Sequence, residues 1–329
     1  MSEDTIISGK GFNNLCDFTF CTRYDNDFGE QIHIGNSLTQ TKTIVLDKIY
    51  PSNTEIMFVH NHKDTFSYEL NGKELTVTRT DENYGWGQNL IGYIYKNIEI
   101  NENNKIFLNP YLFKYFLNIL EKNPPKNKFT LILHNSDNKF TEETYKLIEK
   151  YVNKVYTINN IFNHENVYTI PIGFMDWPIN TYSVVKNIKE EQEQEKTILI
   201  YLNFSILTNP EKRARCFYIF HEKPWVTVHE FLPIEEFYLQ MAKSKYILAP
   251  EGAGIDCHRI YEAICLDSIP ILEKTEMDDF YKNLPVLIVD DYNSVTENDL
   301  KENYEIRLNK LKEWKENNPE WLNSEFWIK

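Results

Sequence analysis

The sequence predicts an α/β protein built from two domains. From Thr197 onward, short apolar runs alternate with helical patterns, which is typical of a parallel sheet covered by helices. The chain has 329 residues, long for a single core. With 42% hydrophobic and 14% aromatic residues, it has enough apolar material for two packed domains.

The C-terminal half is the more regular part. Strands are expected at 197–202, 225–229, 246–249, 269–272 and 286–289. Helices are expected between them, at 210–221, 233–242, 256–266 and 276–282. Each helix has a length that suits a crossover between parallel strands, so a single parallel sheet is expected here.

The N-terminal half is less regular. Strands are expected at 42–46, 55–60, 73–78, 129–134 and 167–170, and helices at 111–122 and 141–153. These patterns predict a second α/β domain with extra strands near its start.

The segment 186–196 is rich in glutamate and has no apolar residue after Ile188, so it is interpreted as an exposed helix or linker. The predicted domains are 1–185, which binds the acceptor, and 186–305, which binds the donor. A helical tail, 306–329, ends in a tryptophan-rich stretch and is expected to pack back toward the first domain, because its aromatic side chains would otherwise form an exposed apolar patch.

Charge and terminal pattern exclude several classes. A formal net charge of -14 argues against a nucleic-acid partner, which would require a basic face. The start of the chain does not look like a signal peptide, and no apolar run is long enough for an integral membrane segment. The five cysteines include no Cys-x-x-Cys pair, which favours reduced thiols and a cytoplasmic location, the host cytoplasm if the protein is viral.

A glycine loop lies between a predicted strand and a predicted helix. It runs over 250–255 and contains Gly252 and Gly254, and Asp256 is a suitable N-cap for the helix that follows. Strand, glycine loop and helix together direct backbone N–H groups at an anion, and the helix N-terminus adds positive potential. A diphosphate fits such a place.

Three ionisable side chains share one arc of the following helix. At 100° per residue, His258, Arg259 and Glu262 lie together, opposite an apolar face. Arg259 offers a planar fork for phosphate, Glu262 can accept hydrogen bonds from ribose hydroxyls, and His258 can donate to a phosphate or a leaving-group oxygen. The alternative is an i,i+3 ion pair of Arg259 and Glu262 on a solvated helix face.

The run 245–272 resembles the donor-site signature of exostosin-like GT-B glycosyltransferases: a strand, a Pro and Gly loop, an Arg, a Glu-Ala pair and a second strand. The segments 76–87, 134–137, 170–174 and 201–204 look similar to viral and bacterial relatives of that group. The resemblance implies two Rossmann-like domains facing a cleft, with Arg259 at the donor diphosphate and Glu262 at the ribose. Asp267 and Ser268 depart from it, because the family usually has a glycine there, so the turn may differ in shape.

Five further residues are assigned to donor binding. Asn135 and Ser136 follow a predicted strand, at the edge where open α/β sheets bind ligands, but they also suit a local Asx or Ser turn. Gly173 allows a close backbone approach or is simply a turn glycine. Asn203 ends the first strand of the donor domain, and Arg213 follows on a helix where it either reaches the phosphates or is solvated.

A general base for the acceptor hydroxyl is expected from the first domain. Asp81 is the chosen candidate, because Arg79, Trp86 and two glycines surround it in a loop that suits a sugar. An incidental acid in a hairpin connection is the alternative. Asp25 and Asp27 have the Asp-x-Asp spacing of metal-bound nucleotide sugars, but that motif belongs mostly to another fold, so no metal is predicted.

The predicted function is therefore transfer of a hexose or pentose (EC 2.4 type), metal-independent and inverting. The donor is a UDP- or GDP-sugar rather than a tightly bound cofactor, and the acceptor is a carbohydrate or glycoconjugate. One alternative is a non-catalytic protein of the same fold that binds a glycan or a nucleotide sugar. Another is a phosphate-binding epimerase or kinase, although the corresponding glycine motifs do not occur where required.

Overall fold

The structure is a computed structural model that describes residues 5–20, 54–59, 67–70, 73–76, 90–95, 103–122, 124–176, 179–191 and 194–328. Contacts between Cα atoms divide the chain into two compact units. Unit 1 comprises residues 1–12, 137–141 and 157–329, and unit 2 comprises 13–136 and 142–156. This division differs from the boundary expected at residue 186, because residues 157–185 cluster with the C-terminal part of the chain.

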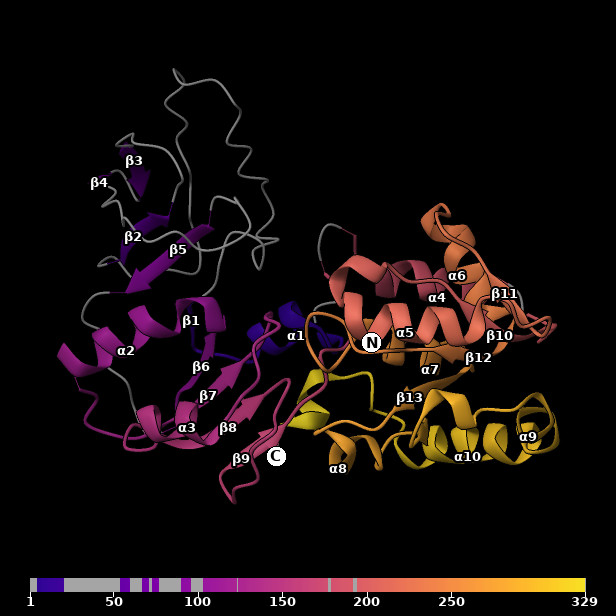
Figure 1. The fold of residues 1–329 in the computed structure, drawn as a ribbon. Coiled ribbons are helices and arrows are strands. Elements are labelled where there is room, and N and C mark those ends of the chain that lie inside the picture. Colours follow the sequence, from indigo (N-terminus) through magenta and orange to yellow (C-terminus); the bar gives the residue numbers. More distant parts are fainter. Residues whose placement is uncertain are drawn as a thin grey trace. The chain divides into compact units, whose positions relative to one another are not determined.

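Unit 1 is built on a five-stranded parallel sheet (Figure 1). Its strands are β10 (Ile198–Leu202), β11 (Val226–Val228), β12 (Ser244–Leu248), β13 (Ile269–Glu273) and β14 (Leu287–Val289). The order across the sheet is β11-β10-β12-β13-β14. Every strand predicted in this half is confirmed.

This strand order creates a switch point. After β10 the chain moves to one side to form β11, and then returns past β10 to form β12, β13 and β14 on the other side. The loops that leave the carboxyl ends of β10 and β12 therefore diverge, and open α/β sheets bind their ligands in the crevice that this divergence opens.

Helices cover both faces of this sheet (Figure 1). The crossovers are α5 (Pro210–Phe220), α6 (Ile234–Ala242), α7 (His258–Cys265) and α8 (Asp278–Tyr281), close to the ranges predicted. On one face α5 packs in the same core cluster as α9 (Glu297–Glu302) and α10 (Tyr304–Asn317). On the other, α4 (Thr181–Glu191) contacts α6 and α7.

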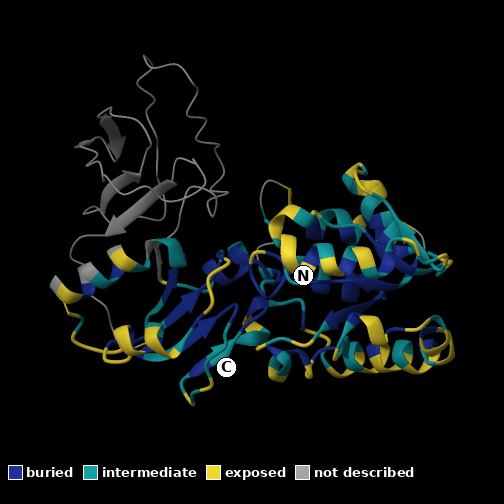
Figure 2. Ribbon diagram, in the orientation of Figure 1, coloured by how far each residue is buried: buried dark blue, intermediate teal, exposed yellow. Residues whose placement is uncertain are grey.

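Alternation along the strands produces these two layers. Ile200 and Leu202 point into the cluster with α5, whereas Tyr201 lies 6.1 Å from the ring of Phe237 on α6. Period-two alternation of apolar side chains on both faces is what a sheet buried between helices requires. The resulting core is the dark band through the sheet in Figure 2.

The other five-stranded sheet has the order β1-β6-β7-β8-β9, and its first four strands lie in unit 2. These strands are β1 (Phe18–Phe20), β6 (Lys105–Leu108), β7 (Phe129–Leu133) and β8 (Val152–Thr157), and the fifth, β9 (Val167–Thr169), confirms the strand expected at 167–170. The helices of unit 2 are α2 (Phe113–Lys122), preceded by the 3-10 turn η3 (Pro110–Leu112), and α3 (Glu142–Ile148). The helix predicted over 141–153 is wrong in its second half, because β8 begins at Val152.

The extra strands predicted near the N-terminus are confirmed. β2 (Thr54–Val59) pairs antiparallel with β5 (Leu90–Tyr95), and β3 (Ser67–Leu70) pairs antiparallel with β4 (Lys73–Thr76). The strand expected at 42–46 lies outside the described residues. Sheets of parallel strands with helices confirm the α/β fold class.

The segment 186–196, expected as an exposed helix or linker, begins with the end of a helix that is packed on one side. α4 extends to Glu191 and buries Tyr182, Val185 and Ile188. The glutamates beyond Ile188 lie on its last turn and after it, so the polar composition describes only the end of this helix.

The tryptophan-rich tail packs within unit 1. Trp321 is buried, and the indole N–H of Trp314 donates to the carbonyl oxygen of Asn283 at 2.7 Å. The last 3-10 turn, η6 (Ser324–Trp327), meets the start of the chain, where α1 (Gly9–Asn13) begins: Ser324 Oγ donates to Ile6 O at 2.9 Å. The aromatic residues are thus largely covered, as their composition suggested.

Candidate donor-binding site

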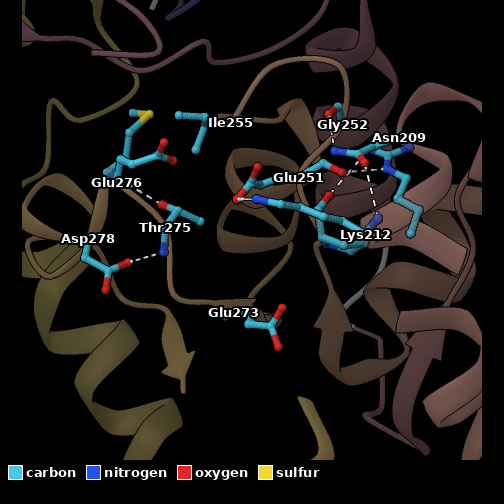
Figure 3. Close-up of polar contacts among 12 residues, drawn as sticks. Asn209, Lys212, Glu251, Gly252, Ile255, Glu273, Thr275, Glu276 and Asp278 are labelled. Atoms are coloured by element: carbon cyan, nitrogen blue, oxygen red, sulfur yellow. Dashed lines mark hydrogen bonds and ion pairs between the residues drawn. The ribbon is translucent and has the colours of Figure 1, made fainter. Parts of the chain in front are cut away.

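The glycine loop follows β12 and is held from behind by α5. Asn209, the N-cap of α5, donates its amide to Gly252 O at 2.9 Å, and Lys212 pairs with the Glu251 carboxylate (Figure 3). Within the loop, Gly252 N donates to Gly254 O at 3.0 Å. The loop therefore forms a closed turn, in which the backbone N–H of Gly252 already donates a hydrogen bond within the loop.

Both loop glycines are required by close neighbours. A Cβ on Gly252 would lie 2.9 Å from Arg213 Nη2, and a Cβ on Gly254 would lie 2.8 Å from Asn159 Nδ2. These glycines let the loop approach side chains of the protein, in addition to any ligand.

Asp256 has a different role from the one expected. α7 begins at His258 with Cys257 at its N-cap, so Asp256 does not cap it. Its buried carboxylate accepts hydrogen bonds from Tyr261 (2.6 Å), Tyr281 (3.1 Å) and Ile172 N (2.8 Å). Burial raises the pKa of Asp256 to about 6, which these hydrogen bonds limit. Asp256 braces the loop from inside and has no free face for a donor.

A small void lies behind the loop. It measures about 20 Å³ and is lined by Lys212, Glu251, Glu273, Thr275 and Tyr292 among others (Figure 3). A void of this size holds no more than a water molecule. It is not a substrate site.

The larger cavity lies at the switch point, in front of β10 and β12. Its volume is about 360 Å³, within the range of small-molecule sites. One wall is polar and contains Arg213, His258, Arg259 and Glu262; the other is apolar and is formed by Met175, Leu232, Ile234 and Phe237. The structure thus brings together around one cavity the arc predicted on α7 and the arginine predicted on α5.

Two guanidinium groups that line this cavity lie over the same aromatic ring. The Cζ atoms of Arg213 and Arg259 lie 5.6 and 5.8 Å from the ring centroid of Phe204. Among the described residues, neither arginine forms an ion pair with a carboxylate. Burial, together with the charge of Arg259, lowers the pKa of Arg213 to about 10. The arginine remains charged at neutral pH, so the cavity has an excess of positive charge.

Backbone carbonyls hold the two arginines in place. Arg213 donates to Glu251 O and Ser205 O, each at 3.0 Å, and Arg259 donates to Asn203 O at 2.9 Å. The alternative interpretation, an i,i+3 ion pair of Arg259 with Glu262, is absent from the ion pairs of the described residues. Carbonyl groups orient an arginine without neutralising it, which leaves the charge available for an anion.

His258 is oriented by Gly173. The imidazole Nδ1 lies 2.7 Å from the carbonyl oxygen of Gly173, which can only accept, so Nδ1 carries a proton. This leaves Nε2 to accept from a ligand or, in the doubly protonated ring, to donate to one. Gly173 itself has φ +65, and a Cβ there would lie 2.0 Å from Ile7 O, so this position requires glycine.

Glu262 is buried at the bottom of the cavity. Tyr238 OH donates to Glu262 Oε1 at 2.7 Å, and this contact raises the pKa of Tyr238, although burial is the larger cause. One carboxylate oxygen is thereby fixed in direction.

The remaining predicted residues are placed differently. Asn203 uses its carbonyl for Arg259 and its side-chain amide for Tyr201 OH at 3.0 Å, so it shapes the site from outside the cavity. Asn135 (φ 63) and the buried Ser136 belong to unit 2, where the carbonyl of Asn135 accepts from Asn109. Asp81, with Arg79 and Trp86, lies outside the described residues.

The turn after α7 has the shape that glycine would give. Asp267 has φ 57, Ser268 N donates to Ala263 O at 2.9 Å and Asp267 N donates to Ile264 O at 3.2 Å, which is a Schellman ending. The departure at Asp267 therefore does not alter the turn. Its carboxylate pairs with Lys315 and Lys189.

Sequence patterns did not single out the side chains of two contributors to the site. Phe204 and Tyr238 occur in runs that are typical of core positions. Only their contacts with Arg259 and Glu262 distinguish them.

Comparison with known proteins finds a similarity for the C-terminal part of the chain. Residues 189–324 match the family model described as the RXYLT1 C-terminal domain. The matched segment contains β10 to β14 and every residue of the cavity except Met175. No curated protein sequence matches the chain.

Solved structures with a loose similarity are trehalose-phosphate enzymes. The N-terminal domain of Candida albicans trehalose-6-phosphate phosphatase is 12% identical, with a TM-score of 0.38. The similarity covers 64% of this chain and 66% of the Candida albicans chain, just under two thirds of its length. The UDP-forming trehalose-phosphate synthase of Burkholderia vietnamiensis is 10% identical, with a TM-score of 0.41 over 69% and 70%. With TM-scores below 0.5, nothing about the site is inferred from them.

The described residues contain neither a membrane-spanning helix nor a group of side chains that could bind a metal ion. No helix there combines the length and the apolar character needed to cross a bilayer. In the same residues, His, Cys, Asp and Glu side chains do not gather in a group of three or more that could hold a metal ion.

Proposed function

We propose that this protein transfers a hexose or pentose from a nucleoside-diphosphate sugar to a carbohydrate or glycoconjugate acceptor. The observation that carries the proposal is the pair Arg213 and Arg259, which lines the cavity at the switch point without a carboxylate partner among the described residues. A diphosphate would supply the missing negative charge.

The other cavity residues fit the rest of a nucleotide. Glu262 has a carboxylate oxygen directed by Tyr238, and carboxylates accept hydrogen bonds from the two hydroxyls of a ribose. The apolar wall, formed by Leu232, Ile234 and Phe237 with Met175, suits the face of a base. UDP and GDP are the nucleotides we propose.

Chemistry in this site would be mainly electrostatic. As the sugar leaves, negative charge grows on the β-phosphate, and preorganised arginines stabilise it without reorganisation. His258 Nε2 would donate to the same oxygen when the ring is protonated. Because these groups can perform the task of a divalent cation, we propose a metal-independent transfer.

Inversion of the anomeric centre is the stereochemistry we propose, with Asp81 as the base for the acceptor hydroxyl. A base on the acceptor side completes the reaction by removing the hydroxyl proton as the new bond forms.

Thermal-shift measurements test the donor site most simply. UDP, GDP and ADP, each with and without Mn²⁺, and the corresponding sugars would be compared. A ligand at a hundred times its Kd stabilises a protein by about 2.7 kcal/mol, which is easily seen. We expect UDP or GDP to stabilise the protein without Mn²⁺. Absence of stabilisation by every nucleotide would refute the proposal, and stabilisation that requires Mn²⁺ would refute its metal-independent form.

A further inference from the structure

Arg259 and Glu262 carry opposite charges on α7, line the same cavity and do not pair with each other. Residues three apart on a helix have Cβ atoms about 5–6 Å apart, within reach of an ion pair. Each of the two side chains is bound by a neutral group instead. The guanidinium donates to Asn203 O at 2.9 Å, and one carboxylate oxygen accepts from Tyr238 OH at 2.7 Å.

The hydroxyl of Tyr238 is a fixed donor. Tyr238 is buried on α6, where its ring meets the ring of Phe237 edge-on, with the centroids 4.8 Å apart. Burial and the charge of Glu262 both raise the pKa of Tyr238, so the hydroxyl keeps its proton at neutral pH. Within the described part of the chain, Tyr238 is the side chain that donates to this carboxylate. The direction of a buried charge on α7 therefore depends on one hydroxyl from α6.

The carbonyl that holds Arg259 is fixed in a similar way. Asn203 directly follows β10, and its side-chain amide donates to Tyr201 OH at 3.0 Å. The guanidinium also lies 5.8 Å from the ring centroid of Phe204. A carbonyl and an aromatic ring orient a guanidinium group without cancelling its charge. The two opposite charges on α7 are thus held apart by neutral neighbours.

We propose that Tyr238 is a positioning residue that keeps Glu262 from pairing with Arg259, and so keeps Arg259 available for the diphosphate of the donor. The inference rests on the proposed function. A buried carboxylate without a donor is unfavourable, so Glu262 released by Tyr238 would turn to another partner. Arg259 is a cation within its reach on the same helix. An ion pair between them would cancel one of the two positive charges that attract the diphosphate.

Calorimetric titration of the full chain with inorganic pyrophosphate tests this role. Pyrophosphate contains the diphosphate but no ribose, so it offers no hydroxyl of a sugar to Glu262. The titration is done without a divalent cation. Tyr238→Phe is expected to weaken pyrophosphate binding about tenfold, the effect of losing one charge-assisted hydrogen bond, although the hydroxyl itself does not bind the ligand.

Glu262→Gln separates positioning from a purely structural effect. An amide cannot neutralise Arg259, so this variant should bind pyrophosphate at least as tightly as the wild type. Adding Tyr238→Phe to Glu262→Gln should then cause no further loss. Tyr218→Phe is the matched control, because Tyr218 lies on α5, is 70% exposed and does not line the cavity. Its affinity for pyrophosphate should equal that of the wild type.

Four results would count against the proposals. Wild-type affinity in Tyr238→Phe would overturn the positioning role. The same loss in the Glu262→Gln background would overturn it as well, because the loss would then come from a changed cavity. Binding of UDP or GDP without binding of pyrophosphate would overturn it too, because the arginines would not bind an anion by themselves. If the wild type binds neither pyrophosphate nor a nucleotide, the proposed function itself fails. Far-UV circular dichroism and melting temperatures show that the variants are folded.

Discussion

Arg213 and Arg259 share the ring of Phe204, with their Cζ atoms 5.6 and 5.8 Å from its centroid. The positive charge of Arg259 adds to burial in lowering the pKa of Arg213, so the two charges repel each other in the free protein. A diphosphate bound to both arginines would relieve this repulsion.

Replacing Arg259 by lysine retains the positive charge but removes the planar guanidinium group, which can donate two parallel hydrogen bonds. Because a bidentate contact to phosphate and stacking on Phe204 both depend on the planar guanidinium, Arg259→Lys is expected to weaken UDP or GDP binding by about tenfold. Titration calorimetry at two salt concentrations measures this. Affinity equal to that of the wild type would show that only the charge matters.

Glu262→Gln is expected to reduce the preference for ribose. In the wild type, removal of the 2′- or 3′-hydroxyl from the nucleotide leaves the buried carboxylate with Tyr238 but without the ribose donor, so affinity should fall about tenfold or more. In Glu262→Gln the difference between nucleotide and deoxynucleotide should shrink. Competition binding with UDP, 2′-deoxy-UDP and 3′-deoxy-UDP is the measurement. An unchanged difference would place the ribose elsewhere.

Gly252→Ala is expected to impair nucleotide binding more than stability. The new Cβ would lie 2.9 Å from Arg213 Nη2, the end of a flexible side chain, so the guanidinium would shift rather than the backbone. The neighbouring Ala253 is exposed, and Ala253→Ser is the matched control. Melting temperature and nucleotide affinity would be measured together. A large fall in melting temperature without a change in affinity would contradict this account.

Lys196 is expected to make stability depend on pH. Burial lowers the pKa of Lys196 to about 7, Asp267 opposes this shift, and Lys315 and Lys189 add to it. Between about pH 7 and the unfolded pKa of 10.5 the unfolded chain binds a proton that the folded chain does not, so the free energy of unfolding should rise with pH, by up to about 1.4 kcal/mol per pH unit.

Urea unfolding from pH 6.5 to pH 9.5 measures this slope. Lys196→Met should lose it, whereas Lys186→Met, which removes a more exposed amine on α4, should retain it. The same slope in Lys196→Met and wild type would assign the pH dependence to other groups.

Much of unit 1 could be predicted from the sequence because its signals are local. The strands alternate with helices of ordinary length, and the arc His258, Arg259 and Glu262 follows from helical geometry alone. The position of Arg213 near the start of a helix predicts that it reaches the donor phosphates. In the structure, Arg213 and Arg259 line the same cavity.

Other features could not be predicted, because they depend on contacts between distant residues. Asp256 is a typical N-cap in sequence, but hydroxyls of Tyr261 and Tyr281 draw its carboxylate inward. β8 continues directly from a helical pattern, and only its place beside β7 in the sheet makes it a strand.

The central claim is that Arg259 holds the donor diphosphate during transfer. Release of UDP or GDP from the nucleotide sugar that binds, with water or a glycan as acceptor, measures it directly in the wild type, Arg259→Ala and Arg215→Ala. Arg215 lies on α5 and pairs with Glu273 and Asp291, outside the cavity, which makes it the matched control. The account predicts that Arg259→Ala lowers kcat/KM at least about a hundredfold while Arg215→Ala stays close to the wild type. Equal rates for Arg259→Ala and wild type would contradict it.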